Sequence, residues 1–141
     1  AFARPVGARL GGAVTLLGYD LAPEALRPGE TLELTLYWRA EERMGTPYKV
    51  FTHIVDAADH VWGQQDNEPV QGTYPTTGWL PGEIVIDRYH LALDAGAPAG
   101  EYRVEVGMYD PATLVRLSAI DADGTPLDHD RVLLGAVRVA R

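Results

Sequence analysis

TLELTLYWR, residues 31–39, alternates apolar and polar side chains without a break. Successive side chains of an extended strand point to opposite faces, so Leu32, Leu34, Leu36 and Trp38 share one face. The threonine, glutamate, tyrosine and arginine side chains between them fall on the other face. This segment therefore predicts a β-strand with one face in a hydrophobic core.

The same two-residue period recurs along the chain. Residues 102–109 (YRVEVGMY) alternate in the same way, and residues 48–55 (YKVFTHIV) are apolar on both faces, as a central strand would be. Residues 84–93 (IVIDRYHLAL) are also strand-like, although Asp87 and Arg88 interrupt the apolar run. Shorter or terminal strands are expected at 14–19, 61–65, 114–120 and 132–139.

Similar turn sequences precede three of these strands: Pro28-Gly29-Glu30, Pro81-Gly82-Glu83 and Pro98-Ala99-Gly100-Glu101. Proline followed by glycine suits a type II turn, because glycine takes a positive φ without strain. About eight short strands separated by such turns predict an all-β fold. We expect an antiparallel β-sandwich of the immunoglobulin-like or jelly-roll-like kind, with an up-and-down barrel as the alternative.

The chain has 141 residues, which is the size of one domain. We expect residues 13–141 to form a single β-sandwich domain and residues 1–12 (AFARPVGARLGG) to be a linker or leader segment. Because the chain starts without methionine, we interpret it as a domain from a longer protein.

The composition excludes several classes of function. Twenty acidic residues outnumber 12 basic ones and give a formal net charge of -8, which disfavours nucleic acid and anionic membrane surfaces as partners. The absence of cysteine removes disulfides, thiolate nucleophiles and cysteine-ligated metals. No apolar run approaches the roughly 20 residues of a membrane helix, so we expect no membrane insertion by this segment.

The residues that could support catalysis form no recognisable motif. Ser118 is the single serine and lacks the Gly-x-Ser-x-Gly turn of a nucleophile elbow. His53 and His90 fall in predicted strands, where a packed histidine is the more common case, and a mechanistic role for His53 would need a carboxylate neighbour. We found no phosphate-binding glycine motif. The sequence therefore predicts a non-catalytic domain without a cofactor.

The irregular segment QGTYPTTGWLPGE, residues 71–83, combines aromatic rings with turn residues. Trp62, Tyr74 and Trp79 lie in or beside loops, where they are candidates to stack on a sugar ring. For Trp79 we favour the alternative that the ring closes the open end of the sandwich, because large exposed apolar patches are unusual on a monomer.

Two aspartates bracket this segment and are candidate loop anchors, namely Asp66 and Asp87. Asp87 falls on a core face, where a carboxylate needs hydrogen-bond donors. We expect the backbone N–H groups and three threonines of residues 73–79 to supply them.

A second loop, DADGTPLDHD at residues 121–130, is rich in carboxylates. Oxygen ligands for Ca²⁺ could come from Asp121, Asp123, Asp128 and Asp130. The spacing differs from an EF-hand loop, since glycine follows the second aspartate directly and the terminal glutamate is missing. The alternative is a solvated loop, because Asp, Gly and Pro all favour turns.

Several phrases of the chain, in order, resemble one family. They are LLGYDL (16–21), PGETLELTLYWRA (28–40), YKVFTHIVD (48–56), QQDNEPVQGTYPTTGWLPGEIVIDRY (64–89), PAGEYRVEVGMYD (98–110) and RL (116–117). The family is a domain near the C-terminus of large bacterial membrane proteins, many similar to lipid-linked-sugar glycosyltransferases of the mannosyltransferase type. The most specific part runs from Asp66 to Asp87. The chain departs from the family at residues 57–60, where small residues or glycine are usual.

This resemblance implies a β-sandwich on the extracytoplasmic side of a bacterial membrane. The parent enzyme would hold the catalytic residues elsewhere, and the partner would be the parent membrane domain or a glycan. No functional residue is transferred by the resemblance. The leading hypothesis is a non-catalytic accessory domain with a scaffold or interaction role. The alternative is a carbohydrate-binding module that uses the loop aromatics.

Overall fold

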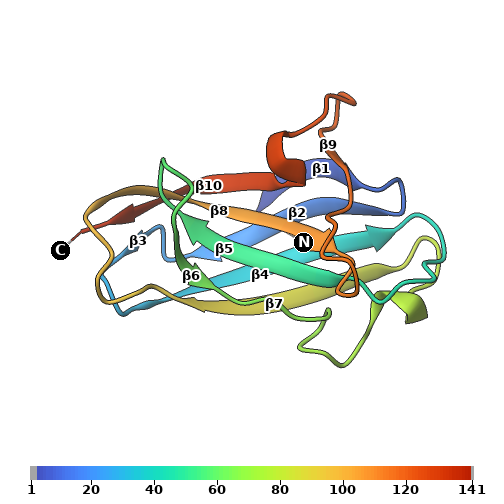
Figure 1. Cartoon of the computed structure of the whole chain (residues 1–141), viewed down its shortest axis with the longest axis horizontal. Helices are drawn as coiled ribbons and strands as arrows, with labels where there is room; N and C mark the ends of the chain where they lie inside the picture. Colours follow the sequence, from blue (N-terminus) through green and yellow to red (C-terminus); the bar gives the residue numbers. More distant parts are fainter. Residues whose placement is uncertain (1–2, 141) are drawn as a thin grey trace.

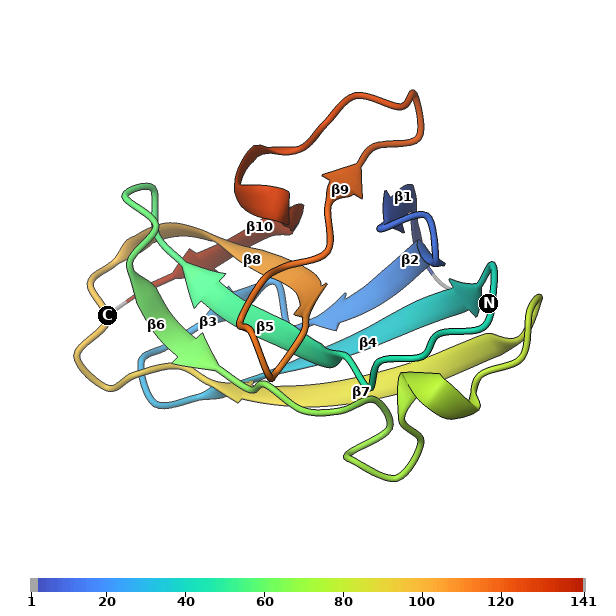
Figure 2. The same ribbon diagram turned by 45° about the vertical axis from the view of Figure 1, so that its right-hand side comes forward.

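The computed structural model describes residues 3–140, which form two packed five-stranded sheets (Figures 1 and 2). In order across the first sheet lie β7 (Ile84–Ala92), β4 (Thr31–Ala40), β2 (Val14–Ala22), β1 (Arg4–Leu10) and β9 (Ala119–Ile120). In order across the second sheet lie β3 (Ala25–Leu26), β10 (Val132–Val139), β8 (Gly100–Tyr109), β5 (Lys49–Val55) and β6 (Val61–Gln64). Two short 3₁₀ helices, η1 (Thr76–Gly78) and η2 (Asp128–Asp130), lie in the loops.

Pairing is antiparallel throughout both sheets except between β3 and β10. The predicted all-β antiparallel sandwich is therefore confirmed. The long strands lie where the alternation predicted them, but residues 114–120 are extended only at Ala119–Ile120. No helix within residues 3–140 is long and apolar enough to cross a membrane.

The prediction that residues 1–12 lie outside the sandwich is wrong. Arg4–Leu10 form β1, which pairs with β2 and, at its end, with β9. The strand escaped detection because its pairing register shifts between Pro5 and Ala8. Such a bulge breaks the two-residue alternation that identifies a strand.

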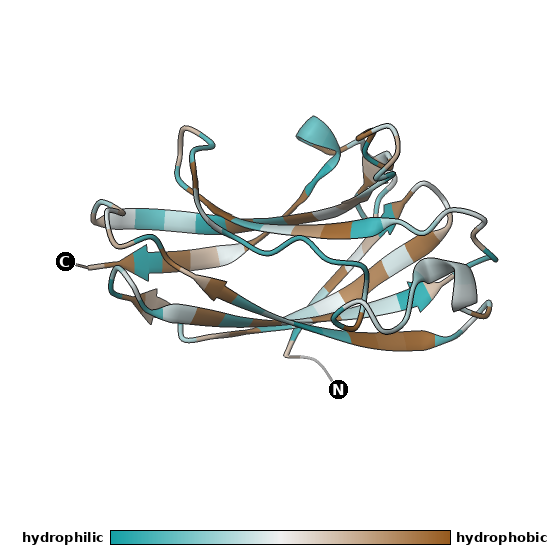
Figure 3. Ribbon diagram, turned by 60° about the horizontal axis from the view of Figure 1, so that its bottom comes forward, coloured by the Kyte–Doolittle hydropathy of each residue, from teal (hydrophilic) through white to brown (hydrophobic). Residues whose placement is uncertain are grey.

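The core lies between the two sheets, and β4 shows how the sequence builds it. The four apolar side chains of its alternating face are at most 1% exposed, and each stabilises the fold by roughly 1.5–3 kcal/mol through transfer from water. Hydrophobic and hydrophilic segments alternate along the strands in Figure 3. The turns before β4 and β7 have the predicted geometry, with φ of 87° at Gly29 and 85° at Gly82.

Candidate functional site

The outer face of the second sheet is partly covered by two loops. Residues 110–118 follow β8 and return across the beginning of β5 (Figure 2), where Arg116 pairs with Tyr109 in an isolated bridge. Residues 121–131 precede β10 and contain η2. The side chains of β5 and β8 that point away from the core meet these loops and form the candidate site.

The apolar floor of the site depends on a glycine. Phe51 on β5 lies opposite Gly107 on β8, and a Cβ atom at position 107 would come 2.5 Å from Phe51 Cζ. Only glycine therefore lets the phenylalanine ring lie across β8. The Arg116 guanidinium carbon sits 4.1 Å from the centroid of this ring, which is a cation–π contact.

His53 is held between two carboxylates. Its Nδ1 atom lies 2.7 Å from Glu105 Oε2, and its Nε2 atom lies 3.1 Å from Asp66 Oδ1. Arg131 Nη1 extends the network, because it donates to Glu105 Oε1 at 2.8 Å and to Asp59 Oδ1 at 2.7 Å. The result is a row of alternating charges in the order Asp66, His53, Glu105, Arg131, Asp59, which we call the His53 network.

The network fixes the protonation states of its two central members. Burial opposes the charged form of His53, but the hydrogen bonds to Asp66 and Glu105 outweigh it and raise the histidine pKa to about 9. Burial likewise opposes ionisation of Glu105, but hydrogen bonds from His53 and Arg131 lower its pKa to about 2. At neutral pH both ring nitrogens of His53 are therefore protonated donors.

Two neighbouring hollows flank this network and share part of their lining. The first, of about 260 Å³, is lined by Phe51, His53, Asp66, Tyr109, Leu114 and Arg116. The second, of about 300 Å³, is lined by His53, Asp59, Val61, Glu105, Arg116, His129 and Arg131. His53 and Arg116 line both hollows, so we call them the first and second lobes of the Arg116 groove.

Arg116 ties the two covering loops together. Its Nη1 atom donates to the His129 carbonyl oxygen at 2.8 Å, and its Nη2 atom lies 4.0 Å from Glu105 Oε2. About one third of its side chain remains exposed. The guanidinium has five N–H donors, so its bond to His129 leaves donors for a ligand in the groove.

The loop aromatics do not form the predicted sugar-stacking row. Trp79 is fully buried and donates from Nε1 to the Tyr74 carbonyl oxygen, so its ring belongs to the core and is not open to a ligand. The Tyr74 ring is tilted by 48° to that of Trp79, and its hydroxyl donates to Glu83. Trp62 donates to Asp56 in the β5–β6 hairpin. None of the three lines either lobe of the Arg116 groove.

Asp87 is a buried anchor, as predicted, but its donors are different. It accepts hydrogen bonds from the Val70 backbone N–H at 2.8 Å, the Tyr89 hydroxyl at 2.6 Å and the Trp38 indole at 3.3 Å. Burial raises the pKa of this carboxyl group against those three bonds. The prediction that residues 73–79 supply the donors is therefore wrong.

Residues 73–79 are held instead by Thr76, whose hydroxyl donates to the Thr46 carbonyl oxygen and accepts from the Tyr48 N–H. Asp66, the other predicted anchor, belongs to the His53 network.

The loop aspartates do not form the calcium site that the sequence suggested. Asp121 accepts the backbone N–H groups of Asp123 and Thr125, so its carboxylate stabilises a turn. Asp130 accepts from the Ala119 N–H. Within residues 3–140, no group of three histidine, aspartate or glutamate side chains could hold a metal ion.

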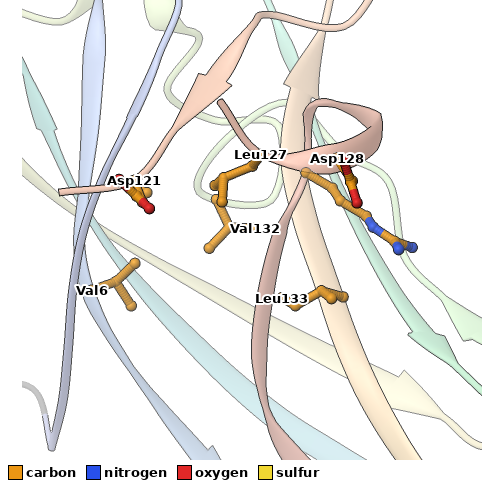
Figure 4. Close-up of a pocket in the computed structure, with 8 residues that line it drawn as sticks. Val6, Asp121, Leu127, Asp128, Val132 and Leu133 are labelled. Carbon is orange, nitrogen blue, oxygen red and sulfur yellow. The ribbon is translucent and has the colours of Figure 1, made fainter. Parts of the chain in front are cut away.

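Two of these aspartates line a separate crevice between β1 and β10 (Figure 4). Asp121 and Asp128 lie at the edge of this crevice, which has a volume of about 370 Å³. Its walls are mainly apolar, with Leu127 and Val132 beside each other and Val6 on the β1 side. The His53 network reaches it only through Arg131, which lines both the crevice and the second lobe.

The sequence pattern places His53 in a strand but does not indicate its carboxylate partners, Glu105 and Asp66. Glu105 is 52 positions away, and only the register of β5 against β8 brings the two side chains together. The alternation of residues 102–109 indicates which side chains point outward, but it does not indicate that this strand pairs with β5.

Comparison with solved structures finds similar chains at low sequence identity. The crystal structure of the C-terminal domain of Wzt is 14% identical and covers 98% of this chain and 83% of that chain, with a TM-score of 0.62. The CARDB domain of the PF1109 protein from Pyrococcus furiosus, in complex with di-metal ions, is 13% identical over 99% and 92%, with a TM-score of 0.47. β-Glucosidase from Listeria innocua, in complex with glucose, is 13% identical over 90% and 16%, with a TM-score of 0.48.

The likeness to the C-terminal domain of Wzt shows a shared fold. No protein-family model matches this chain, and no curated protein matches it in sequence. A shared fold does not by itself define a function.

Proposed function

We propose that this β-sandwich is a non-catalytic accessory domain of a larger protein and that it contacts carbohydrate through the Arg116 groove. The observation that carries the proposal is the mixture of surfaces in that groove. Tyr109 and Leu114 offer apolar surface beside the charged groups of Asp66 and Arg116. Sugars present C–H faces together with hydroxyl groups, so they match apolar walls with a few fixed polar groups.

The His53 network argues against chemistry in the same groove. A general base needs a free lone pair, but both ring nitrogens of His53 engage carboxylates and its pKa is about 9. Glu105 has a pKa of about 2 and so holds no proton to donate near neutral pH. The network orders the groove floor and holds both of its central titratable groups, His53 and Glu105, in fixed hydrogen bonds.

The larger protein, on this proposal, is a glycosyltransferase-like bacterial membrane protein that displays the domain outside the cytoplasm. Its support is the family resemblance of residues 16–117 and the shared fold with a C-terminal β-domain. Alkaline phosphatase fused after residue 141 of the full-length parent tests the location. Activity of the fused phosphatase in intact cells is expected, and an inactive but intact fusion contradicts an extracytoplasmic position.

A glycan array tests the binding function directly. The isolated chain should bind at least one glycan class, and Arg116→Ala should lose at least about tenfold in affinity, equivalent to 1.4 kcal/mol. Arg138→Ala is the matched control, because Arg138 is an exposed arginine on β10 outside the groove. Equal binding by wild type and Arg116→Ala, or no binding by the folded wild type, contradicts the proposal.

A scaffold role is the second candidate, and an apolar patch favours it. Ile84 and Ile86 are exposed on the same face of β7, an edge strand of the first sheet, and the exposed Leu80 lies in the turn before this strand. Apolar side chains gathered on one surface mark contacts with other protein surfaces, here the parent membrane domain. Ile84→Glu with Ile86→Glu should release the domain from a co-expressed parent membrane region in a pull-down. Unchanged retention contradicts docking at this patch.

A further inference from the structure

The two lobes of the Arg116 groove differ in chemistry. The first lobe offers apolar surface from Tyr109 and from Leu114, which is 73% exposed. Leu114 also has a φ of 63°, an uncommon conformation for a bulky residue and one that clusters at binding sites. The second lobe is more polar, with Asp59 and Arg131 on its walls and Val61 as its apolar side chain.

Arg116 stands between the two lobes. Its side chain lines both, and its guanidinium packs over the Phe51 ring while one N–H bonds to the His129 carbonyl oxygen. The cation therefore covers the floor where the lobes join. A ligand in only one lobe would contact Arg116 from one side, and the polar groups of the other lobe would remain hydrated.

Building on the proposed carbohydrate function, we infer that the groove selects glycans of at least two linked sugar units, with one unit in each lobe and the linkage beside Arg116. The first unit packs a C–H face on Leu114 and Tyr109 and directs hydroxyls to Asp66. The second unit directs its hydroxyls to Asp59 and Arg116. Once one unit is bound, the linked unit binds at a high effective concentration, so the disaccharide gains affinity beyond either monosaccharide.

Calorimetric titration with matched glycan series tests this inference. Probes are the mono-, di-, tri- and tetrasaccharides of mannose, glucose, galactose and N-acetylglucosamine. In each series that binds, the step from mono- to disaccharide should raise affinity at least tenfold, and later steps should add less than threefold. Equal affinity for mono- and disaccharide, or an equal gain at every added unit, overturns the two-lobe inference but leaves carbohydrate binding intact.

Lobe-specific variants locate the second unit. Val61 is 39% exposed and lines only the second lobe of the groove, so Val61→Trp should fill that lobe. This variant should lower disaccharide affinity to that of the monosaccharide and leave monosaccharide affinity unchanged. Leu114→Ala should weaken both ligands about equally. Unchanged disaccharide binding by Val61→Trp overturns the assignment of the second lobe.

Val115→Ala is the control, since Val115 is exposed beside Leu114 but lines neither lobe. It should bind every probe as the wild type does, and a loss equal to that of Leu114→Ala overturns the placement of the first unit. Absence of binding to every series by a wild-type chain with native NMR dispersion rejects the carbohydrate function itself. That result differs from a failure of the two-lobe inference, in which binding persists without the disaccharide gain.

Discussion

His53 Nδ1 lies 2.7 Å from Glu105 Oε2, across a pair of residues in register between β5 and β8. The imidazolium sits between two carboxylates, so it links the centre of the second sheet to the loop that carries Asp66. Arg131 extends the same contact to Asp59 in the β5–β6 hairpin. His53 thus joins β5 directly to β8 and to the Asp66 loop, and Arg131 carries the network on to the hairpin.

Stability should depend on pH through this pair. The folded pKa of His53 is raised from 6.5 to about 9, so its contribution is complete below pH 6.5 and is lost as the pH rises through 9. The contribution of Glu105 to stability depends on pH in the opposite direction, because folding lowers its pKa from 4.5 to about 2. Its contribution is complete above pH 4.5 and is lost as the pH falls through 2.

Urea unfolding at pH 5.5, 7.5 and 9.5 measures how much stability is lost as His53 deprotonates. The free energy of unfolding of the wild type should fall by up to about 3 kcal/mol between pH 5.5 and pH 9.5. This follows from the rise of the His53 pKa from 6.5 to about 9, at 1.36 kcal/mol for each pH unit. His53→Gln should flatten this dependence. An equally steep loss in the variant would assign the pH dependence to another group.

Asp87→Ala should destabilise the fold by about 1–3 kcal/mol, because it leaves the donors of Val70, Tyr89 and Trp38 without their acceptor. Asp87→Asn retains an acceptor oxygen and should cost less. Arg88→Ala is the control, because Arg88 is the next residue of β7 and is exposed. Its change in the free energy of unfolding should be near zero. Chemical denaturation measures all three, and a near-zero change for Asp87→Ala would refute the anchor role.

Gly107→Ala should cost about 1–3 kcal/mol, because the added methyl group overlaps the Phe51 ring. Phe51→Leu in the same chain should recover part of that loss by opening space above position 107. Additive losses in this double-mutant cycle would show that the ring and the glycine are not coupled. The measurement is the free energy of unfolding for both single variants and the double variant.

Trp79→Ala should cost about 3–5 kcal/mol, since it empties a fully buried indole site. Trp79→Phe should cost less, and Leu80→Ala should cost little because Leu80 is exposed. Glycan binding by Trp79→Phe should equal that of the wild type, because Trp79 lies outside the groove. A selective loss of binding with stability retained would return Trp79 to the ligand site.

The fold was predictable where a strand has one buried face and an unbroken register. Residues 31–39 meet both conditions, and the structure places them as β4 at the core. Residues 4–10 bury only Ala8 and Leu10, and a proline and a glycine with a φ of 78° accompany the bulge that breaks the register of β1. The local pattern there reads as a linker, and only pairing with β2 makes it a strand.

The site was less predictable because its residues meet by register. Asp87 was recognisable from its position on a core face, but its donors include the indole of Trp38 on the neighbouring strand. The alternation places Glu105 on the outward face of its strand, as the structure does. Glu105 is nevertheless buried, because Arg131 and the loops outside the sheet cover it. Such loop coverage leaves no periodic signal in the sequence.

Arg116 also bears on how such a domain can diversify. The Arg116 side chain between the lobes comes from the 110–118 loop, whereas the floor beneath it belongs to paired strands. Exchanging that arginine for a small residue would merge the two lobes into one trough without disturbing either sheet. If the proposed glycan binding holds, preference for chain length can therefore evolve in the loop while the sandwich stays unchanged.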